Sequence, residues 1–251
     1  MALAQGVTSA NTVGYTTKTI AADTFYLCGI QFEEVGNGTG AIKLDDLISM
    51  SGIQACGYDD MENDGAQIQV LNASGSGYNK YYYISDAYDS GGSEVTGWAD
   101  GAGDLAENAI NIGKGFWFKA PAAAISGTAS LTLNGQVSGN ASGVVSFTAN
   151  TFALAANPFP VAVDFADVTV SGITAVGYDD METSAAQIQV LNASGSGYNK
   201  YYYINDAYDA GGSEVTGWAD GAGDLAEGDS ISVGAGFWVK SPTAGSITFS
   251  L

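Results

Sequence analysis

The chain has 251 residues, 46% of them hydrophobic and 14% charged, a globular composition that argues against a disordered or collagen-like protein. Its 27 acidic and 7 basic residues give a formal net charge of −20, which argues against a nucleic-acid partner because phosphate binding needs basic side chains. There is no histidine and no apolar run of about 18 residues, so the commonest general base is missing and we expect no transmembrane segment.

The first residues have the form of a signal-peptidase site. Ala2-Leu3-Ala4 before Gln5 follows the small-x-small pattern, although the charged and apolar regions that normally precede such a site are missing. A chance alanine-rich start is the alternative. We expect a secreted protein that is extracellular or attached to the cell surface.

An internal repeat organises the sequence. Residues 57–107 match residues 177–227 at a constant shift of 120, with 46 of 51 positions identical. Weaker similarity extends outwards on both sides of this stretch. The repeat predicts three parts: an N-terminal extended segment (1–12), a first β repeat (13–134) and a second β repeat with a linking strand (135–251).

Short runs bounded by Gly, Asn, Asp and Ser are typical of strands and turns. In chain order, the expected strands of the first repeat are 67–72, 78–84, 95–98, 110–112, 116–119, 130–133 and 136–137. The last two should form a hairpin across Asn134-Gly135, and helical signals are limited to 44–50 and 104–109. The pattern predicts an all-β protein with two tandem homologous β-sandwich or barrel-like domains.

The two cysteines, Cys28 and Cys56, do not form a Cys-x-x-Cys motif. Their counterparts in the second repeat are Ala155 and Val176, which indicates that both positions face a core. A disulfide and two inert buried thiols both fit this pattern, and we favour the disulfide.

Acidic clusters occur in both repeats, in likely loops. Oxygen ligands on Gly-rich loops suit Ca²⁺, so calcium is the one cofactor that the sequence suggests, with solvated turn carboxylates as the alternative. The candidate ligands are Asp59, Asp60, Asp100 and Asp104, with their copies Asp179, Asp180, Asp220 and Asp224. Paired carboxylates are also found in glycoside hydrolases, which makes glycoside hydrolysis a further hypothesis. The acidic clusters are, however, duplicated almost unchanged, which is unusual for a single catalytic cleft, and we expect no enzyme.

Recurring aromatic residues have two interpretations. Most should pack in the core, while Tyr82 and Tyr202 should point outward, because they lie opposite the face formed by their neighbours in the strand. Exposed Tyr and Trp side chains can stack on sugar rings or fill a protein interface. Glycans are therefore a possible class of partner.

Short motifs resemble those of a known type of protein. Ser9-Ala10-Asn11-Thr12-Val13-Gly14-Tyr15, the Gly-x-Gly-Phe-Trp segments at 113–117 and 234–238, and Asn157-Pro158-Phe159-Pro160 are similar to segments of secreted two-repeat β-proteins of environmental bacteria. The resemblance implies export and a two-repeat layout. It implies no activity and no site residues.

The chain ends suggest assembly with copies of itself. The C-terminal strand carries Ile247, Phe249 and Leu251 and lacks the partner that its counterpart near Leu131 should have. The segment Gln5, Gly6, Val7, Thr8 and Ser9 resembles that missing partner, and unpaired strands pair with other chains. We therefore expect a structural subunit of an extracellular filament or surface layer, joined head-to-tail, with a secreted carbohydrate-binding module as the alternative.

Overall fold

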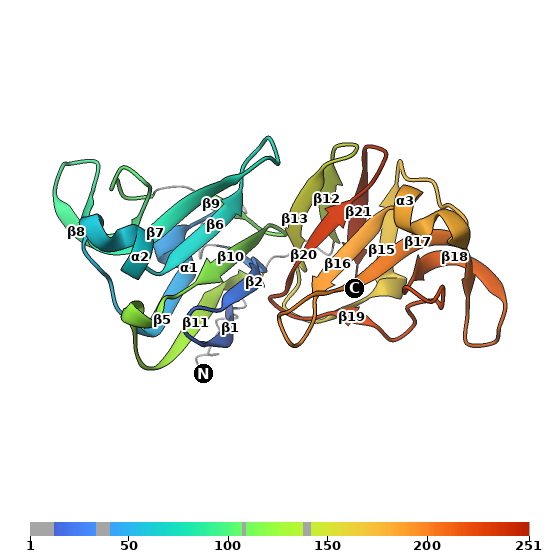
Figure 1. Ribbon diagram of the computed structural model, residues 1–251, viewed down its shortest axis with the longest axis horizontal. Coiled ribbons are helices and arrows are strands. Elements are labelled where there is room, and N and C mark those ends of the chain that lie inside the picture. The colour runs from blue at the N-terminus through green and yellow to red at the C-terminus, as the bar shows by residue number, and fades with distance from the viewer. Residues whose placement is uncertain (1–12, 34–40, 107–108, 138–141, 251) are drawn as a thin grey trace, which may run out of the picture.

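The structure is a computed structural model that describes residues 13–33, 41–106, 109–137 and 142–250. These residues form an all-β protein in which antiparallel sheets have a sandwich-like arrangement, so the predicted all-β, sandwich-like class is confirmed, while the division into two homologous domains stays a prediction. Figure 1 shows two halves side by side, one built from residues up to 137 and the other from residue 142 onward. No described helix is long and apolar enough to cross a membrane.

The first half contains a five-stranded sheet in the order β2-β10-β6-β7-β8 and a four-stranded sheet. In the latter, β11 lies between β1 on one side and β5 and β3 on the other. The strands are β1 (Val13–Ile20), β2 (Phe25–Gly29), β3 (Phe32–Glu33), β5 (Ile48–Ile53), β6 (Gln67–Leu71), β7 (Tyr78–Tyr88), β8 (Glu94–Ala99), β10 (Gly115–Lys119) and β11 (Ile125–Val137).

The second half pairs its strands in a matching order, β13-β20-β16-β17-β18 in one sheet and β12-β21-β15 in the other. These strands are β12 (Ser142–Phe147), β13 (Phe152–Ala156), β15 (Val168–Ser171), β16 (Gln187–Leu191), β17 (Tyr198–Tyr208), β18 (Glu214–Ala219), β20 (Gly236–Lys240) and β21 (Gly245–Ser250). The expected boundary at residue 134 is not tested by this pairing and stays a prediction.

Short elements complete each half. Two small pairs join β4 (Ala41–Lys43) to β9 (Ala109–Asn111) and β14 (Val163–Asp164) to β19 (Ser230–Ile231). The helices are α1 (Leu44–Leu47), α2 (Met61–Asp64) and α3 (Met181–Ser184), with 3₁₀ turns η1 (Tyr58–Asp60), η2 (Ala122–Ala124), η3 (Phe165–Asp167) and η4 (Tyr178–Asp180). The expected helical turn near 44–50 is present as α1, whereas α2 and α3 were not predicted.

The main core lies between the two sheets of each half. Side chains alternate along the strands, so Phe116 and Phe118 point inward and are fully buried while Trp117 between them points outward. The equivalent core of the second half is built around Phe237, Val239 and residues of β21. Burying large aromatic side chains from both sheets supplies most of the stabilisation of such a sandwich.

The predicted hairpin at Asn134-Gly135 is wrong. β11 continues straight through these residues, and they pair with Tyr15 and Gly14 of β1. A type I′ turn needs positive φ at both central residues, and Asn134 does not have it. Because β1 offers a full set of hydrogen-bonding partners, the extended ladder replaces the turn.

The prediction that the C-terminal strand lacks a partner is also wrong. β21 pairs with β12 on one side and β15 on the other, and Ile247 faces both Val145 and Val170. Ile247 and Phe249 are fully buried in the core. Gln5 to Ser9 and Leu251 lie outside the described residues, so their part of the hypothesis has no structural account.

The expected disulfide is absent: Cys28 and Cys56 are free thiols. Cys28 lies in the core between the sheets, while Cys56 packs in the cluster beneath α2, on the opposite face of the five-stranded sheet. The sheet therefore separates the two sulfur atoms. Burial raises the pKa of Cys28 to about 11, so this thiol stays protonated and unreactive at neutral pH.

Tyr82 and Tyr202 are buried, not exposed as predicted, with 4% and 3% of their surface accessible. They do point away from the main core, but α2 and α3 cover that outer face. Met61 of α2 packs with Tyr82 and Ile84, and the second half repeats the arrangement with Met181. The acidic pattern of residues 57–64 predicts only a loop, whereas in the structure this segment covers Tyr82.

Tyr201 predicts how stability changes with pH. Burial, followed by the charge and a hydrogen bond of Asp229, raises the pKa of Tyr201 to about 12. Because an unfolded tyrosine ionises near pH ~10, the unfolded chain loses this proton first, and the free energy of unfolding should fall between about pH 10 and 12. Melting temperatures measured across this range should fall less steeply for Tyr201→Phe. Identical slopes would contradict the assignment.

Candidate ligand-binding site

The two halves contact each other through equivalent backbone positions. The Gly29 N–H donates to the Gly234 carbonyl at 3.0 Å, and the Ala156 N–H donates to the Gly113 carbonyl at 2.8 Å. These are matching positions, since Gly29 pairs with Gly115 in β10 and Ala156 with Gly236 in β20. Each half thus hydrogen-bonds the other with the same part of its structure.

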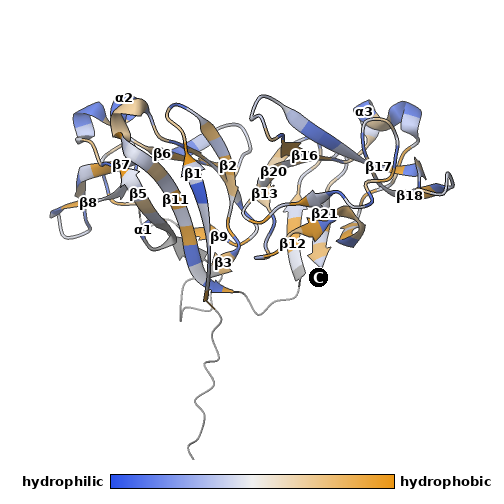
Figure 2. Ribbon diagram, turned by 90° about the horizontal axis from the view of Figure 1, so that it is seen from below, coloured by the Kyte–Doolittle hydropathy of each residue, from blue (hydrophilic) through white to orange (hydrophobic). Residues whose placement is uncertain are grey.

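This contact places the outer faces of the two five-stranded sheets next to each other on one side of the molecule. Figure 2 shows α2 and α3 at opposite ends of the same side of the molecule, with β2, β13 and β20 between them. The helices cover only the outer ends of the sheets, over Tyr82 and Tyr202. The central part of this face carries no helix among the described residues.

The outer face carries the same row of four residues in each half, in which the leucine is buried and the other three side chains are at least partly exposed. One row across the strands is Leu27, Trp117, Gln69 and Lys80, and the matching row is Leu154, Trp238, Gln189 and Lys200. Strand alternation places these side chains opposite the core residues Phe116 and Phe118 and their counterparts. An apolar, an aromatic, an amide and a cationic group therefore follow one another at the spacing of adjacent strands.

Further aromatic rings stand beside each tryptophan. Phe25 meets Trp117 edge-on at 6.1 Å between ring centroids, and Phe152 meets Trp238 in the same way at 5.8 Å. Lys119 lies 5.4 Å from the Phe25 ring centroid, and Lys240 lies 5.4 Å from that of Phe152. Such edge-to-face pairs and cation–π contacts fix the rings in place.

Tyr78 connects the two aromatic groups. Burial raises the pKa of Tyr78, a hydrogen bond with Trp117 lowers it, and the neighbouring Tyr198 hydroxyl of the second half raises it again. Tyr78 and Tyr198 each keep 37% of their surface exposed, and Phe25 and Phe152 keep 43% and 41%. The aromatic side chains of both halves thus form one accessible surface, which we call the aromatic groove.

A cavity of about 340 Å³ lies in the part of the aromatic groove between Tyr78 and Trp238. The loop between β6 and β7 leans over the second half, and Gly75 to Tyr78 face Phe152, Gln189, Tyr198 and Trp238 across the cavity. Asn72 shapes this loop, because its Oδ1 accepts hydrogen bonds from the Ser74 hydroxyl and the Ser76 N–H.

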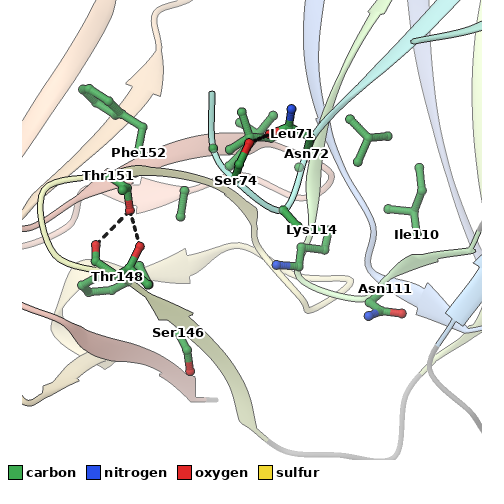
Figure 3. A pocket seen from close by; sticks show the side chains of 17 residues that line it. Leu71, Asn72, Ser74, Ile110, Asn111, Lys114, Ser146, Thr148, Thr151 and Phe152 are labelled. Carbon is green, nitrogen blue, oxygen red and sulfur yellow. Dashed lines mark hydrogen bonds between the residues drawn. The ribbon is translucent and has the colours of Figure 1, made fainter. Parts of the chain in front are cut away.

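A second, more polar pocket of about 440 Å³ lies next to the groove and shares Leu71, Gly75 and Phe152 with it. Figure 3 shows Asn111 and Lys114 on one side of this pocket and Ser146, Thr148 and Thr151 on the other. The hydroxyl of Thr151 bonds to the backbone carbonyl and hydroxyl of Thr148. Together, the groove and pocket offer stacking surfaces, hydrogen-bonding groups and an amine.

The predicted calcium ligands do not gather into a site in the structure. Asp100 Oδ1 accepts the N–H groups of Ala102 and Asp104, and Asp220 does the same for Ala222 and Asp224. Asp59 and Asp60, like Asp179 and Asp180, lie in the 3₁₀ turns before α2 and α3. Among the described residues no three acidic or Cys side chains could jointly hold a metal ion, and calcium binding stays a prediction.

Comparison of the chain with protein-family models, curated proteins and solved structures gives no match. The resemblance to secreted two-repeat β-proteins therefore stays a prediction. One of its motifs has a structural explanation, since the buried Asn157 donates to the carbonyls of Val161 and Ile231 and accepts from the Phe159 N–H.

Proposed function

We propose that the protein is a carbohydrate-binding module whose aromatic groove takes up a polysaccharide. The observation that carries this proposal is the uncovered groove itself, in which Trp117 and Trp238 stand in equivalent rows next to Gln and Lys side chains. The C–H faces of sugar rings stack on aromatic rings, while amide and amine groups hydrogen-bond to the sugar hydroxyls.

Duplication of the rows favours a polymeric ligand. A polysaccharide that contacts both halves gains avidity, because the second contact becomes intramolecular once the first has formed. A short oligosaccharide that reaches one row alone lacks this gain. The proposal therefore places long chains, rather than mono- or disaccharides, as the natural ligands.

Affinity electrophoresis against a panel of neutral and acidic polysaccharides tests the proposal. We expect at least one polymer to retard the native protein, and each of Trp117→Ala and Trp238→Ala to weaken its binding roughly tenfold, which corresponds to about 1.4 kcal/mol per aromatic contact. Tyr15→Ala is the matched control, since Tyr15 is 75% exposed on the other sheet. Undiminished retardation of the double tryptophan variant would refute the assignment of the groove.

Self-assembly remains a second candidate, favoured by a different observation from the one first expected. β1 pairs with β11 and with no other described strand, and its exposed face carries Val13 and Tyr15 at 66% and 75% accessibility. An edge of this kind can add a strand from another chain. β1, rather than the C-terminal strand β21, is therefore the edge that favours assembly, because β21 is paired on both sides.

A further inference from the structure

We propose that the polysaccharide taken up by the aromatic groove is acidic, with uronic-acid carboxylates that pair with Lys80 and Lys200. This inference rests on the proposed function, and it concerns the chemistry of the sugar units rather than the existence of the site. It is carried by where the few basic residues lie and by what they contact.

The lysines are concentrated on one face of the molecule. The chain has 7 basic residues, all lysine, and Lys80, Lys119, Lys200 and Lys240 project from the outer face of the two five-stranded sheets. Lys114 lines the adjoining polar pocket. In a chain with 27 acidic residues, this is a local concentration of positive charge.

Within the described part of the chain, most of these lysines form no ion pair with an acidic side chain. The ion pair found among the described residues joins Lys119 to Asp23, at 3.8 Å. In the second half Asn150 takes the position of Asp23, with the same left-handed φ, and Lys240 is left without that partner. Lys80 and Lys200 are exposed beside Gln69 and Gln189, so their amines are available to a ligand.

Among the described residues, acidic side chains lie near the groove at Asp23, which pairs with Lys119, and at its outer ends on α2 and α3. Glu62 and Glu182 lie on α2 and α3, close enough to Tyr82 and Tyr202 to raise the pKa of each phenol after the larger effect of burial. At physiological ionic strength, exposed charges more than about 8 Å apart are largely screened from one another. A carboxylate in direct contact with Lys80 or Lys200 is screened less than longer-range repulsion by acidic side chains, so these contacts can outweigh that repulsion.

A matched pair of polymers isolates the role of charge. Polygalacturonate and its fully methyl-esterified form share one backbone, and only the first carries carboxylates. Binding is measured for the full chain by affinity electrophoresis at fixed ionic strength. A chelator is present, so that divalent ions cannot bridge the polymer to the acidic loops. We expect the acidic form to bind about tenfold more tightly, from two exposed ion pairs.

The variant Lys80→Gln/Lys200→Gln should remove this preference and bind both polymers as the native protein binds the ester, while Lys18→Gln, on the other sheet, should behave like the native protein. A preference that survives in the double lysine variant, or equal binding of both polymers by the native protein, would overturn the inference and leave the groove assignment intact. Binding of both polymers that is unaffected by Trp117→Ala/Trp238→Ala would instead overturn the proposed function.

Discussion

Replacement of Trp218 by alanine should lower the free energy of unfolding by about 3–5 kcal/mol, the range typical of a large buried aromatic residue. Trp218 is 3% exposed and packs against Tyr203 and Phe165, with ring centroids 5.5 and 6.3 Å away. Its Nε1–H donates to the Val168 carbonyl at 3.0 Å, which links the five-stranded sheet to β15. The substitution removes this packing and leaves a cavity between the sheets.

Urea denaturation of the native protein and of Trp218→Ala measures this loss in the free energy of unfolding. Trp238→Ala is the control, because Trp238 is only half-buried and lies in the groove, so its loss should cost clearly less stability. An equal shift in both variants would mean that Trp218 does not hold the two sheets together.

A single added methyl group at Gly29 should destabilise the protein by about 2 kcal/mol. A Cβ built at this position lies 2.2 Å from the Ala156 Cβ and 3.0 Å from the Ala235 carbonyl oxygen, so the backbones of the two halves must move apart. Gly101→Ala is the matched control, since a Cβ at Gly101 meets nothing within 4 Å and its φ is not in the left-handed region. That variant should change stability by less than about 0.5 kcal/mol.

The compensating change gives a sharper test of the same contact. Gly29→Ala combined with Ala156→Gly transfers the methyl group from one half to the other, and we expect it to recover most of the stability lost in Gly29→Ala. Purely additive effects in denaturation experiments would show that the two residues do not touch.

Strand patterning predicts much of this fold because alternation depends on local sequence. The strands around Ile68, Tyr81 and Phe116 were predicted within a few residues, and so was their sandwich arrangement. The turn at Asn134-Gly135 was predicted wrongly because its fate depends on β1, more than 100 residues away, which pairs with it. A local turn signal cannot register a distant strand that competes for the same hydrogen bonds.

The candidate site was less predictable for a similar reason. Sequence alternation separates Trp117 from Phe116 and Phe118, and this signal identifies an outward tryptophan. It cannot show that α2 covers Tyr82, since that depends on the fold of the chain at 57–64. Nor does it show that Tyr78 of one half lies near Tyr198 of the other, because this follows from the contact between Gly29 and Ala156.

Tryptophan fluorescence gives the most direct measurement of whether the groove binds a polysaccharide. Of the 4 tryptophans, Trp98 and Trp218 are buried at 1% and 3% exposure, while Trp117 and Trp238 line the groove. Acrylamide should therefore quench mainly the groove pair. A saturating polysaccharide should reduce quenching to the level of Trp117→Phe/Trp238→Phe, which retains only the buried pair; quenching that stays unchanged when the polymer is bound would contradict the account.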